Sequence, residues 1–279
     1  MRRRLIVNNK VILKKKGYKA YLILNKPEKL NALDMDMYLD LLHYMKELEK
    51  DSNIRVIIIK GNGRGFSAGY DIKAETDISI SPLEERDSFR DSSNALRWLI
   101  WDINKPVICQ VHGYCLGGAC ELTLPADFVI ASEDAVIGEP EIKFGSPPVF
   151  LMIPWLTGIR KGKELLMTGE NISGNDAEKF GLITKAVPLE KIDEEVESLA
   201  NKLIRIPPEI LYLQKLGINR QFEMMGMKTG IDTWLDMSMY FRFFRTEEIE
   251  TFSRITAEQG VKAALKWRDD FFSEVKAEK

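Results

Sequence analysis

The stretch His112-Gly113-Tyr114-Cys115-Leu116-Gly117-Gly118-Ala119-Cys120-Glu121-Leu122 decides how the rest of the chain is interpreted. It follows an apolar run, residues 106–111, that is typical of a buried strand, and it leads into good helix formers. A strand, a glycine turn and a helix together leave backbone N–H groups at a helix N-terminus, where partial positive charge collects. Glu121 comes one turn later, so the stretch predicts a carboxylate beside a cluster of N–H donors. That combination suits chemistry that passes through an enolate.

The composition is that of an ordinary globular protein. The 279 residues, 45% of them hydrophobic, suffice for one large domain with a sizeable core. The formal net charge of −2, from 40 basic and 42 acidic residues, argues against nucleic acid or an anionic membrane as a partner. No apolar run approaches the roughly 20 residues of a membrane-spanning helix. An odd count of 3 cysteines and 2 distant histidines favours a reducing, cytoplasmic setting and no metal site.

The first part of the chain alternates predicted strands and helices. Residues 11–24 predict a hairpin, and Asp34 is a plausible N-cap for a helix whose apolar side chains recur every three or four residues. Residues 53–60 form a nearly continuous β-branched run, which is typical of a strand buried on both faces. The polar segment 74–87 contains Pro82 and lacks a clear period, so we expect a mobile loop that acts as a lid.

The pattern changes near residue 190. Short strands are predicted around residues 127–131 and 182–187, whereas amphipathic helices dominate afterwards. We therefore divide the chain into an α/β region, residues 1–190, and a helical region, residues 191–279. The helical region is expected to pack on the core or on a neighbouring subunit.

Two turns of small residues are candidates for one shared site. Phe66–Asp71 and Gly117–Glu121 each follow a strand-like run and each expose backbone. If the turns converge, the N–H groups of Ala68 and Gly118 hold one oxygen between them, and a thioester carbonyl is a natural occupant. Negative charge moves onto this oxygen as the neighbouring carbon gains or loses a proton. Loss of one such donor typically raises the barrier by ~3–4 kcal/mol.

Six segments, in order, carry a resemblance to a known family. They are Asn25-Lys26-Pro27 with Asn31-Ala32-Leu33, Phe66 through Ile72, Val111 through Leu122 with Asp127, Pro140-Glu141, Leu166-Met167-Thr168-Gly169, and Ala177 with Gly181-Leu182. At these positions the chain resembles the enoyl-CoA hydratase/isomerase, or crotonase, superfamily over nearly its whole length. The resemblance implies an α/β fold with a spiral core of repeated β-β-α units. It also implies a helical C-terminal region that forms homotrimers, commonly paired into hexamers.

The resemblance further implies a site and an activity. Hydratases of this family carry two glutamates, which fall on Glu121 and Glu141. Glu121 would orient and deprotonate the water that adds to the β-carbon, Glu141 would deliver the α-proton, and the amides of Ala68 and Gly118 would bind the oxyanion. The residues expected to contact the coenzyme A thioester are Leu30, Ala32, Ala68, Gly69, Tyr70, Asp71, Ile72, Gly117 and Gly118. The implied activity is reversible hydration of a 2-enoyl-CoA, as in fatty acid metabolism. Coenzyme A is then part of the substrate, and no metal or separate cofactor is implied.

One segment departs from the hydratases that the chain resembles. Where they continue with a glycine-rich stretch, this chain has Ser146-Pro147-Pro148-Val149-Phe150-Leu151-Met152. Valine disfavours positive φ, so we expect a different backbone path at Val149 and a smaller or more apolar pocket. This leaves two alternatives to a simple hydratase. One is another reaction on an acyl-CoA, namely isomerisation, thioester hydrolysis or hydration of a cyclic or aromatic acyl group. The other is a non-catalytic acyl-CoA-binding protein.

Other polar and reactive side chains have structural interpretations. Glu133, Asp134 and Glu139 crowd Glu141 in the sequence, and any of them could face solvent. The thiols of this region are expected to pack as small apolar groups, and its histidine has no acidic partner at a recognisable spacing. These three residues are Cys115, Cys120 and His112.

Overall fold

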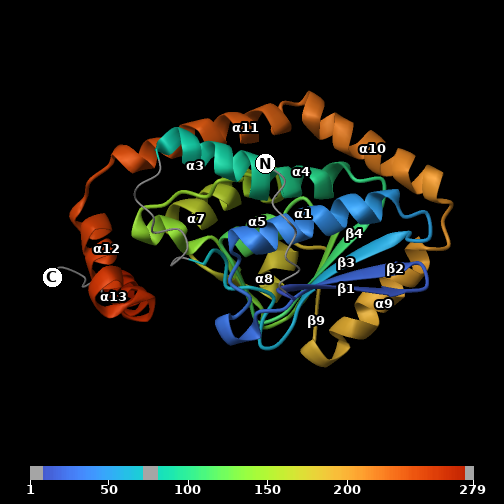
Figure 1. Cartoon of the computed structure of the whole chain (residues 1–279), viewed down its shortest axis with the longest axis horizontal. Coiled ribbons are helices and arrows are strands. Elements are labelled where there is room, and N and C mark those ends of the chain that lie inside the picture. Colours follow the sequence, from blue (N-terminus) through green and yellow to red (C-terminus); the bar gives the residue numbers. More distant parts are fainter. Residues whose placement is uncertain (1–8, 72–80, 274–279) are drawn as a thin grey trace.

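The computed structural model describes residues 9–71 and 81–273, and Figure 1 shows their arrangement. Within these residues a six-stranded sheet has the order β1-β2-β3-β4-β6-β9. β1 pairs antiparallel with β2, and the other neighbouring strands of this sheet are parallel. Its strands are β1 (Val11–Lys16), β2 (Lys19–Leu24), β3 (Val56–Gly61), β4 (Val107–Val111), β6 (Phe128–Ser132) and β9 (Lys185–Val187). A smaller sheet contains β5 (Tyr114–Leu116), β7 (Val136–Gly138) and β8 (Ile172–Ser173).

Helices cover both faces of the larger sheet and continue beyond it. Those of the α/β region are α1 (Met35–Lys50), α3 (Pro82–Phe89), α4 (Ala95–Asp102), α5 (Gly118–Thr123), α6 (Ile153–Thr157), α7 (Ile159–Thr168) and α8 (Gly174–Lys179). The later ones are α9 (Ile192–Leu203), α10 (Pro208–Met224), α11 (Met227–Ser238), α12 (Glu247–Gln259) and α13 (Val261–Ser273). Short 3-10 or π segments are η1 (Pro27–Lys29), η2 (Arg90–Asn94), η3 (Pro140–Phe144), η4 (Leu189–Lys191) and η5 (Met239–Phe243).

Alternate side chains of β3 enter two different cores. Ile57 and Ile59 join the main hydrophobic cluster together with α1, whereas Val56 and Ile58 join a second cluster with α9 on the opposite face. This division with a period of two confirms the prediction of a strand buried on both faces. Because α9 packs on the sheet, it belongs with the α/β body. The division of the chain near residue 190 stays a prediction.

Part of the predicted lid is a helix. Pro82 starts α3, which begins in a capping box: the Ser81 hydroxyl accepts the Glu84 N–H, and the Glu84 carboxylate accepts the Ser81 N–H. Proline fits the first helical turn because an N–H at that position has no acceptor within the helix. The prediction of an irregular loop is therefore wrong for residues 82–87. Its residues 74–80 lie outside the described part of the chain.

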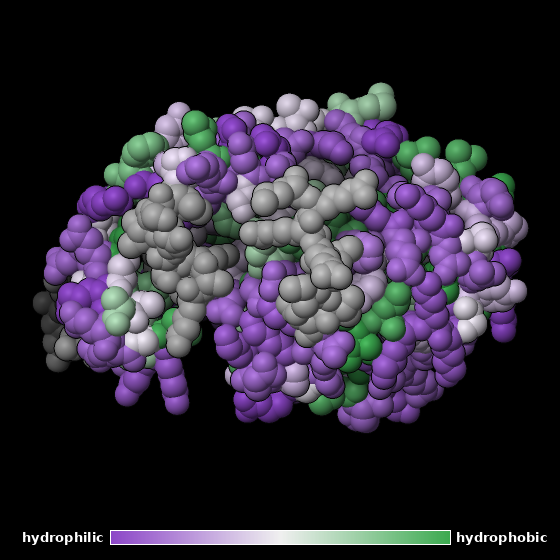
Figure 2. All heavy atoms as spheres, in the orientation of Figure 1, coloured by the Kyte–Doolittle hydropathy of each residue, from purple (hydrophilic) through white to green (hydrophobic). Residues whose placement is uncertain are grey.

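The C-terminal helices extend along the molecule and past its end. α10 and α11 run alongside α4 and α3, and α11 supplies Leu235 to a small apolar cluster with Val149. α12 and α13 form a separate pair with an apolar cluster of their own. Figure 2 shows a notch between this pair and the body. One contact across it lies at Gly145, where an added Cβ would be 2.4 Å from Ile249 Cγ1 of α12.

Candidate active site

A buried asparagine fixes the first of the two predicted turns. Asn31 has a left-handed φ of 53° and no exposed surface. Its side-chain amide donates to the carbonyl oxygens of Asn62, Gly65 and Phe66 at 2.8, 3.0 and 3.1 Å. The Ser67 hydroxyl donates to the backbone carbonyl of Asn31 at 2.8 Å. The loop before α1 and the turn that begins at Phe66 are therefore held as one unit.

The second turn lies directly against the first. The Ser67 N–H donates to the Tyr114 carbonyl at 2.8 Å, and the Leu116 N–H donates to the Ser67 carbonyl at 3.3 Å. An added Cβ on Gly69 would lie 3.6 Å from the nitrogen of Gly118. The convergence of the two turns that the sequence predicts is therefore present.

Glu141 meets the second turn at a glycine. Gly117 has a φ of 51°, and an added Cβ there would lie 1.5 Å from Glu141 Oε1. Only glycine leaves room for this carboxyl group and adopts this conformation without strain. Gly118 then begins α5, and the first N–H groups of a helix have no acceptor within it. The structure thus brings Glu141 to the start of α5.

Four donors surround the carboxylate of Glu121, which has no exposed surface. Its Oε2 accepts from the Arg97 guanidinium at 2.6 Å and from the Tyr70 hydroxyl at 2.5 Å. Its Oε1 accepts the N–H groups of Val149 and Phe150 at 2.6 and 2.8 Å. The segment that departs from the glycine-rich pattern therefore donates its backbone to Glu121.

The sequence prediction missed Arg97. This arginine of α4 is fully buried, with hydrogen bonds to Asn94 Oδ1 at 2.6 Å, Ser93 Oγ at 3.1 Å and Tyr70 Oη at 2.9 Å. Burial is the largest single influence and works against its charge, but the charge of Glu121 together with Tyr70 and Tyr38 prevails and raises the pKa of Arg97 above its ordinary value. The site therefore contains a permanent cation.

A third carboxyl group lies in the same region. Glu133 and Asp134 are exposed, as the sequence allowed, but Glu139 is only 4% exposed, so the solvent-facing alternative is wrong for Glu139. Burial first, and then the charges of Glu121 and Glu141, raise the pKa of Glu139 well above its ordinary value. Glu139 therefore favours its neutral form.

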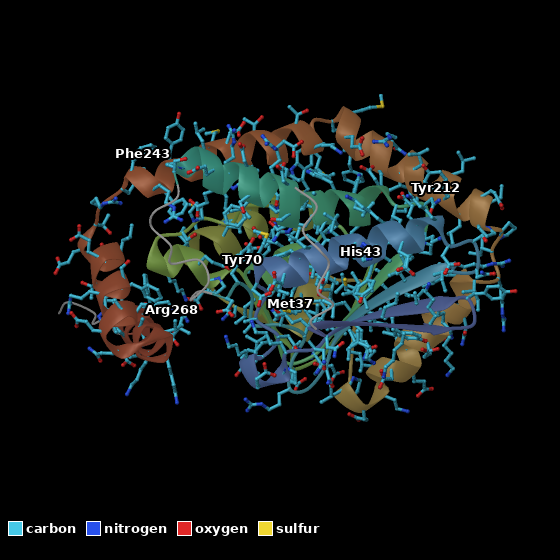
Figure 3. All side chains as sticks on the ribbon, in the orientation of Figure 1. Met37, His43, Tyr70, Tyr212, Phe243 and Arg268 are labelled. Carbon is cyan, nitrogen blue, oxygen red and sulfur yellow. The ribbon has the colours of Figure 1, made fainter. Side chains whose placement is uncertain are left out.

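Ala68 is not placed as the second oxyanion donor. Its N–H already donates to the Leu30 carbonyl at 2.9 Å, so the predicted role of this amide is wrong in the structure. Besides Gly69, Tyr70 of the first turn adjoins Gly118 through its ring, since an added Cβ on Gly118 would lie 2.6 Å from Tyr70 Cζ. Figure 3 shows Tyr70 inside the body of the molecule, near Met37 of α1.

Some of the residues expected to contact coenzyme A lie close to the segment that leads into α1. The Leu33 N–H donates to the Gly69 carbonyl at 2.7 Å, and the Asp71 carboxylate binds Lys26 at 2.8 Å. Burial opposes the charge of Asp71, but the hydrogen bond to Lys26 and its charge prevail, so the pKa of Asp71 is lowered. Ile72 lies outside the described residues, and contact of the set with coenzyme A stays a prediction.

The remaining reactive side chains have structural surroundings. Cys115 and Cys120 are fully buried, and burial raises the pKa of both thiols well above the ordinary value, which makes them poor nucleophiles. His112 Nε2 lies 2.9 Å from the Gly63 carbonyl oxygen. Among the described residues, no group of three or more His, Cys, Asp or Glu side chains could hold a metal ion. In that same part of the chain, no helix is both long and apolar enough to cross a bilayer.

Comparison with known proteins identifies the family of this chain. The family model for enoyl-CoA hydratase/isomerase matches residues 16–269. The chain belongs to this family. It is 33% identical over 246 residues to the short-chain-enoyl-CoA hydratase of Clostridium acetobutylicum, which covers 86% of this chain and 91% of the relative. It is 34% identical over 226 residues to the crotonyl-CoA hydratase of Syntrophomonas wolfei, with 80% and 84% covered.

A solved structure of the family has the same fold. The crystal structure of an enoyl-CoA hydratase/isomerase from Xanthobacter autotrophicus superposes with a TM-score of 0.89 and 31% sequence identity. The superposition covers 94% of this chain and 98% of that one. The predicted family and its mixed α/β fold with several C-terminal helices are therefore confirmed.

Proposed function

We propose that this chain is an enoyl-CoA hydratase, a hydro-lyase that adds water reversibly across the double bond of a 2-enoyl-CoA thioester. Relatives named as hydratases, at 33% and 34% identity, support this activity over isomerisation, thioester hydrolysis or simple binding. The observation that carries the proposal is the meeting of Glu141 with Gly117 beside the buried Glu121. A protein that only binds an acyl-CoA needs neither carboxyl group.

The thioester oxygen is assigned to the start of α5. The N–H of Gly118 is one donor, and we assign the second to the amide of Tyr70, because the turn that contains Tyr70 converges with the turn that contains Gly118. When water oxygen bonds to the β-carbon, negative charge develops on the thioester oxygen, and both donors bind it more tightly. Each donor of this kind is worth about 3–4 kcal/mol in the barrier.

The two glutamates are assigned to the two ends of the double bond. Hydration forms a C–O bond at the β-carbon and a C–H bond at the α-carbon, while one O–H bond of water and the π bond break. Glu141 supplies the proton to the α-carbon, the negative charge of Glu121 polarises the water, and the pair of carboxyl groups takes up the proton that the water loses. Coenzyme A belongs to the substrate, and this scheme needs no separate cofactor or metal.

We also infer a homotrimer or a pair of trimers, located in the cytoplasm and acting in acyl-CoA breakdown. Exposed apolar side chains on α10, among them Ile210, Leu213 and Ile218, support an interface there. The three free cysteines suit a reducing compartment. Sedimentation velocity tests the assembly: a single monomeric species at micromolar concentration would contradict it.

Hydration is tested with crotonyl-CoA by following the loss of the conjugated thioester absorbance. We expect rapid hydration by the wild type and a loss of about 10²–10⁴ in kcat for Glu141→Gln. Glu133→Gln, which changes an exposed carboxyl group nearby, should leave kcat unchanged. Tight binding of CoA thioesters without hydration of short or long 2-enoyl chains would contradict the proposal.

A further inference from the structure

Arg97 has no role in the scheme above, yet it touches the candidate site directly. One nitrogen of its guanidinium, Nη1, is anchored by Asn94 at 2.6 Å and Ser93 at 3.1 Å, both in η2 and within one helical turn of Arg97. The other, Nη2, reaches Glu121 at 2.6 Å and Tyr70 at 2.9 Å. The guanidinium is thus fixed on one side and presents its charge on the other.

Nearby aromatic rings and the absence of solvent strengthen the electrostatic interactions of the Arg97 guanidinium. The centroid of the Phe150 ring lies 5.5 Å from the guanidinium carbon, and the Tyr38 ring lies 5.8 Å from it. The side chains of Arg97 and Glu121 are 0% and 1% exposed. Ring faces favour a cation, and an ion pair is much stronger away from water.

The contacts of Glu121 leave no position for a proton. An ionised carboxylate offers about four acceptor positions. Arg97 and Tyr70 donate to one oxygen, while the amides of Val149 and Phe150 donate to the other. A proton on either oxygen would have to displace one of these donors, so the surroundings select the ionised form.

Several other groups face this pair. They are Tyr70 of the first turn, Tyr38 of α1, Cys120 of α5, and Glu139 and Glu141 of the segment after β7. Among these described groups and Arg97 itself, the arginine is the one cation. Three carboxyl groups around a single cation cannot all be ionised without strong repulsion, so the anion settles on Glu121, which the cation touches.

We propose that Arg97 is a positioning residue that keeps Glu121 ionised throughout the catalytic cycle, so that protons are exchanged at Glu141 instead. This rests on the proposed hydratase activity. Neutral Glu141 gives its proton to the α-carbon from one oxygen. Its other oxygen takes the proton that water loses as the C–O bond forms. Glu141 ends the step neutral, and Glu121 remains an anion.

Infrared difference spectroscopy tests the charge of Glu121 without turnover. Spectra of the wild type minus Glu121→Gln, recorded between about pH 5 and 9, isolate this carboxyl group. We expect a carboxylate band at every pH. In the Arg97→Met background the same difference should contain a protonated component that titrates. A titrating Glu121 in the wild type would overturn the proposal.

Kinetics separate a positioning role from a structural one. Arg97→Met should lower kcat about 10²-fold and add an acidic limb to its pH profile, with CoA-thioester affinity unchanged. Arg97→Lys should restore the wild-type profile shape. Lys215→Met, which removes another buried cation, is the matched control and should keep that shape. Loss of thermal stability in Arg97→Met with an unchanged profile would make the arginine structural and overturn the proposal.

Two further outcomes need separate treatment: an Arg97→Met variant that does not fold, and a wild type that does not hydrate 2-enoyl-CoA. If Arg97→Met does not fold, Tyr70→Phe removes one donor from Glu121 and should produce the same infrared titration to a smaller extent. An unchanged carboxylate band in Tyr70→Phe would then count against the proposal, and so would an Arg97→Lys profile that lacks the wild-type shape. If the wild type hydrates no 2-enoyl-CoA, the proposed function fails, while the infrared result still decides the charge of Glu121.

Discussion

Two buried ion pairs, both in contact with α4, differ in what else they bind. Arg97 and Glu121 are 2.6 Å apart with 0% and 1% of their side chains exposed. Lys215 of α10 and Asp127 are 2.8 Å apart with 8% and 17% exposed. The chemical unit is the same, one cation and one carboxylate, but only the first adjoins the candidate oxyanion site.

The second pair is built from backbone contacts. The Lys215 ammonium donates to the carbonyl oxygens of Ile100 and Lys105, and Asp127 accepts the Val107 N–H. Burial is the largest influence on both groups, so the pKa of Lys215 is lowered and that of Asp127 is raised. Burial is the largest single influence on Arg97 as well, but there Glu121, Tyr70 and Tyr38 together prevail, so the pKa of Arg97 is raised.

The difference shows how a structural pair is told from a site pair. Backbone partners fix where a helix lies, and Lys215 thereby holds α10 against α4 and the end of β4. At Arg97 side-chain partners such as Tyr70 and Asn94 fix the cation at one point, and the backbone contacts of this pair are made to the carboxylate. The partners of a buried ion pair, more than its depth, therefore indicate its role.

Glu121→Gln removes the carboxylate of the Arg97–Glu121 pair at the candidate site, and it has the largest expected effect. It leaves Arg97 buried opposite a neutral amide, and breaking such a pair costs about 3–5 kcal/mol of stability. We expect kcat with crotonyl-CoA to fall at least about 10²-fold, measured at a temperature where circular dichroism shows the variant folded. Near-wild-type activity would mean that Glu121 does not act in the reaction.

Lys215→Met breaks the structural pair and should change stability alone. We expect a loss of about 3–5 kcal/mol in urea unfolding, with kcat of the folded enzyme unchanged. Asp127 then takes up a proton more readily in the folded than in the unfolded state, so the deficit should shrink as the pH falls. The double variant with Asp127→Asn should regain part of the loss. A fall in kcat for Lys215→Met would erase the distinction between the pairs.

Lys26→Met extends the comparison to a less buried network and has the smallest expected effect. Burial opposes the charges of Lys26, Asp34 and Asp71, but their hydrogen bonds prevail, so the pKa of Lys26 is raised and those of both aspartates are lowered. We expect a loss of about 1.5 kcal/mol in urea unfolding. This loss of unfolding free energy should have its full size between about pH 4 and 10, which are the pKa values of Asp and Lys in the unfolded chain. It should shrink below that window as the aspartates protonate. Lys46→Met, on an exposed position of α1, is the control. A difference that persists at pH 2 would contradict the assignment.

Local patterns in the sequence were sufficient for much of the fold. The β-branched run of β3 and the spacing of apolar side chains in α1 both indicate which residues are buried. The Asp34 cap is also present, and its side chain accepts the Met37 N–H at 3.1 Å. The loop expected at residues 74–87 overlooks the capping box at Ser81, and Pro82 stands in the first turn of α3, where proline is tolerated. The error came from the position of the proline relative to the cap.

The candidate site could be predicted only in part, because its charge balance depends on contacts between distant segments. Glu121 and Glu141 are recognisable from their motifs, but nothing in the neighbours of Arg97 shows that it meets a carboxylate 24 residues away. Glu139 is one of several acidic residues close together in the sequence, and only the fold determines which of them are buried. The Ala68 error is similar, since its acceptor is the distant Leu30 carbonyl.

The contact between Gly145 and Ile249 connects the C-terminal helix α12 to the segment that carries Glu141. Glu141 lies in η3, and Gly145 caps this short segment with a φ of 84° that leaves no space for a side chain. α12 and α13 share an apolar cluster of their own, separate from the two clusters of the sheet. Proteolytic nicking between α11 and α12 would then free the turn behind the acid, and the product would be an inactive protein with an intact central sheet.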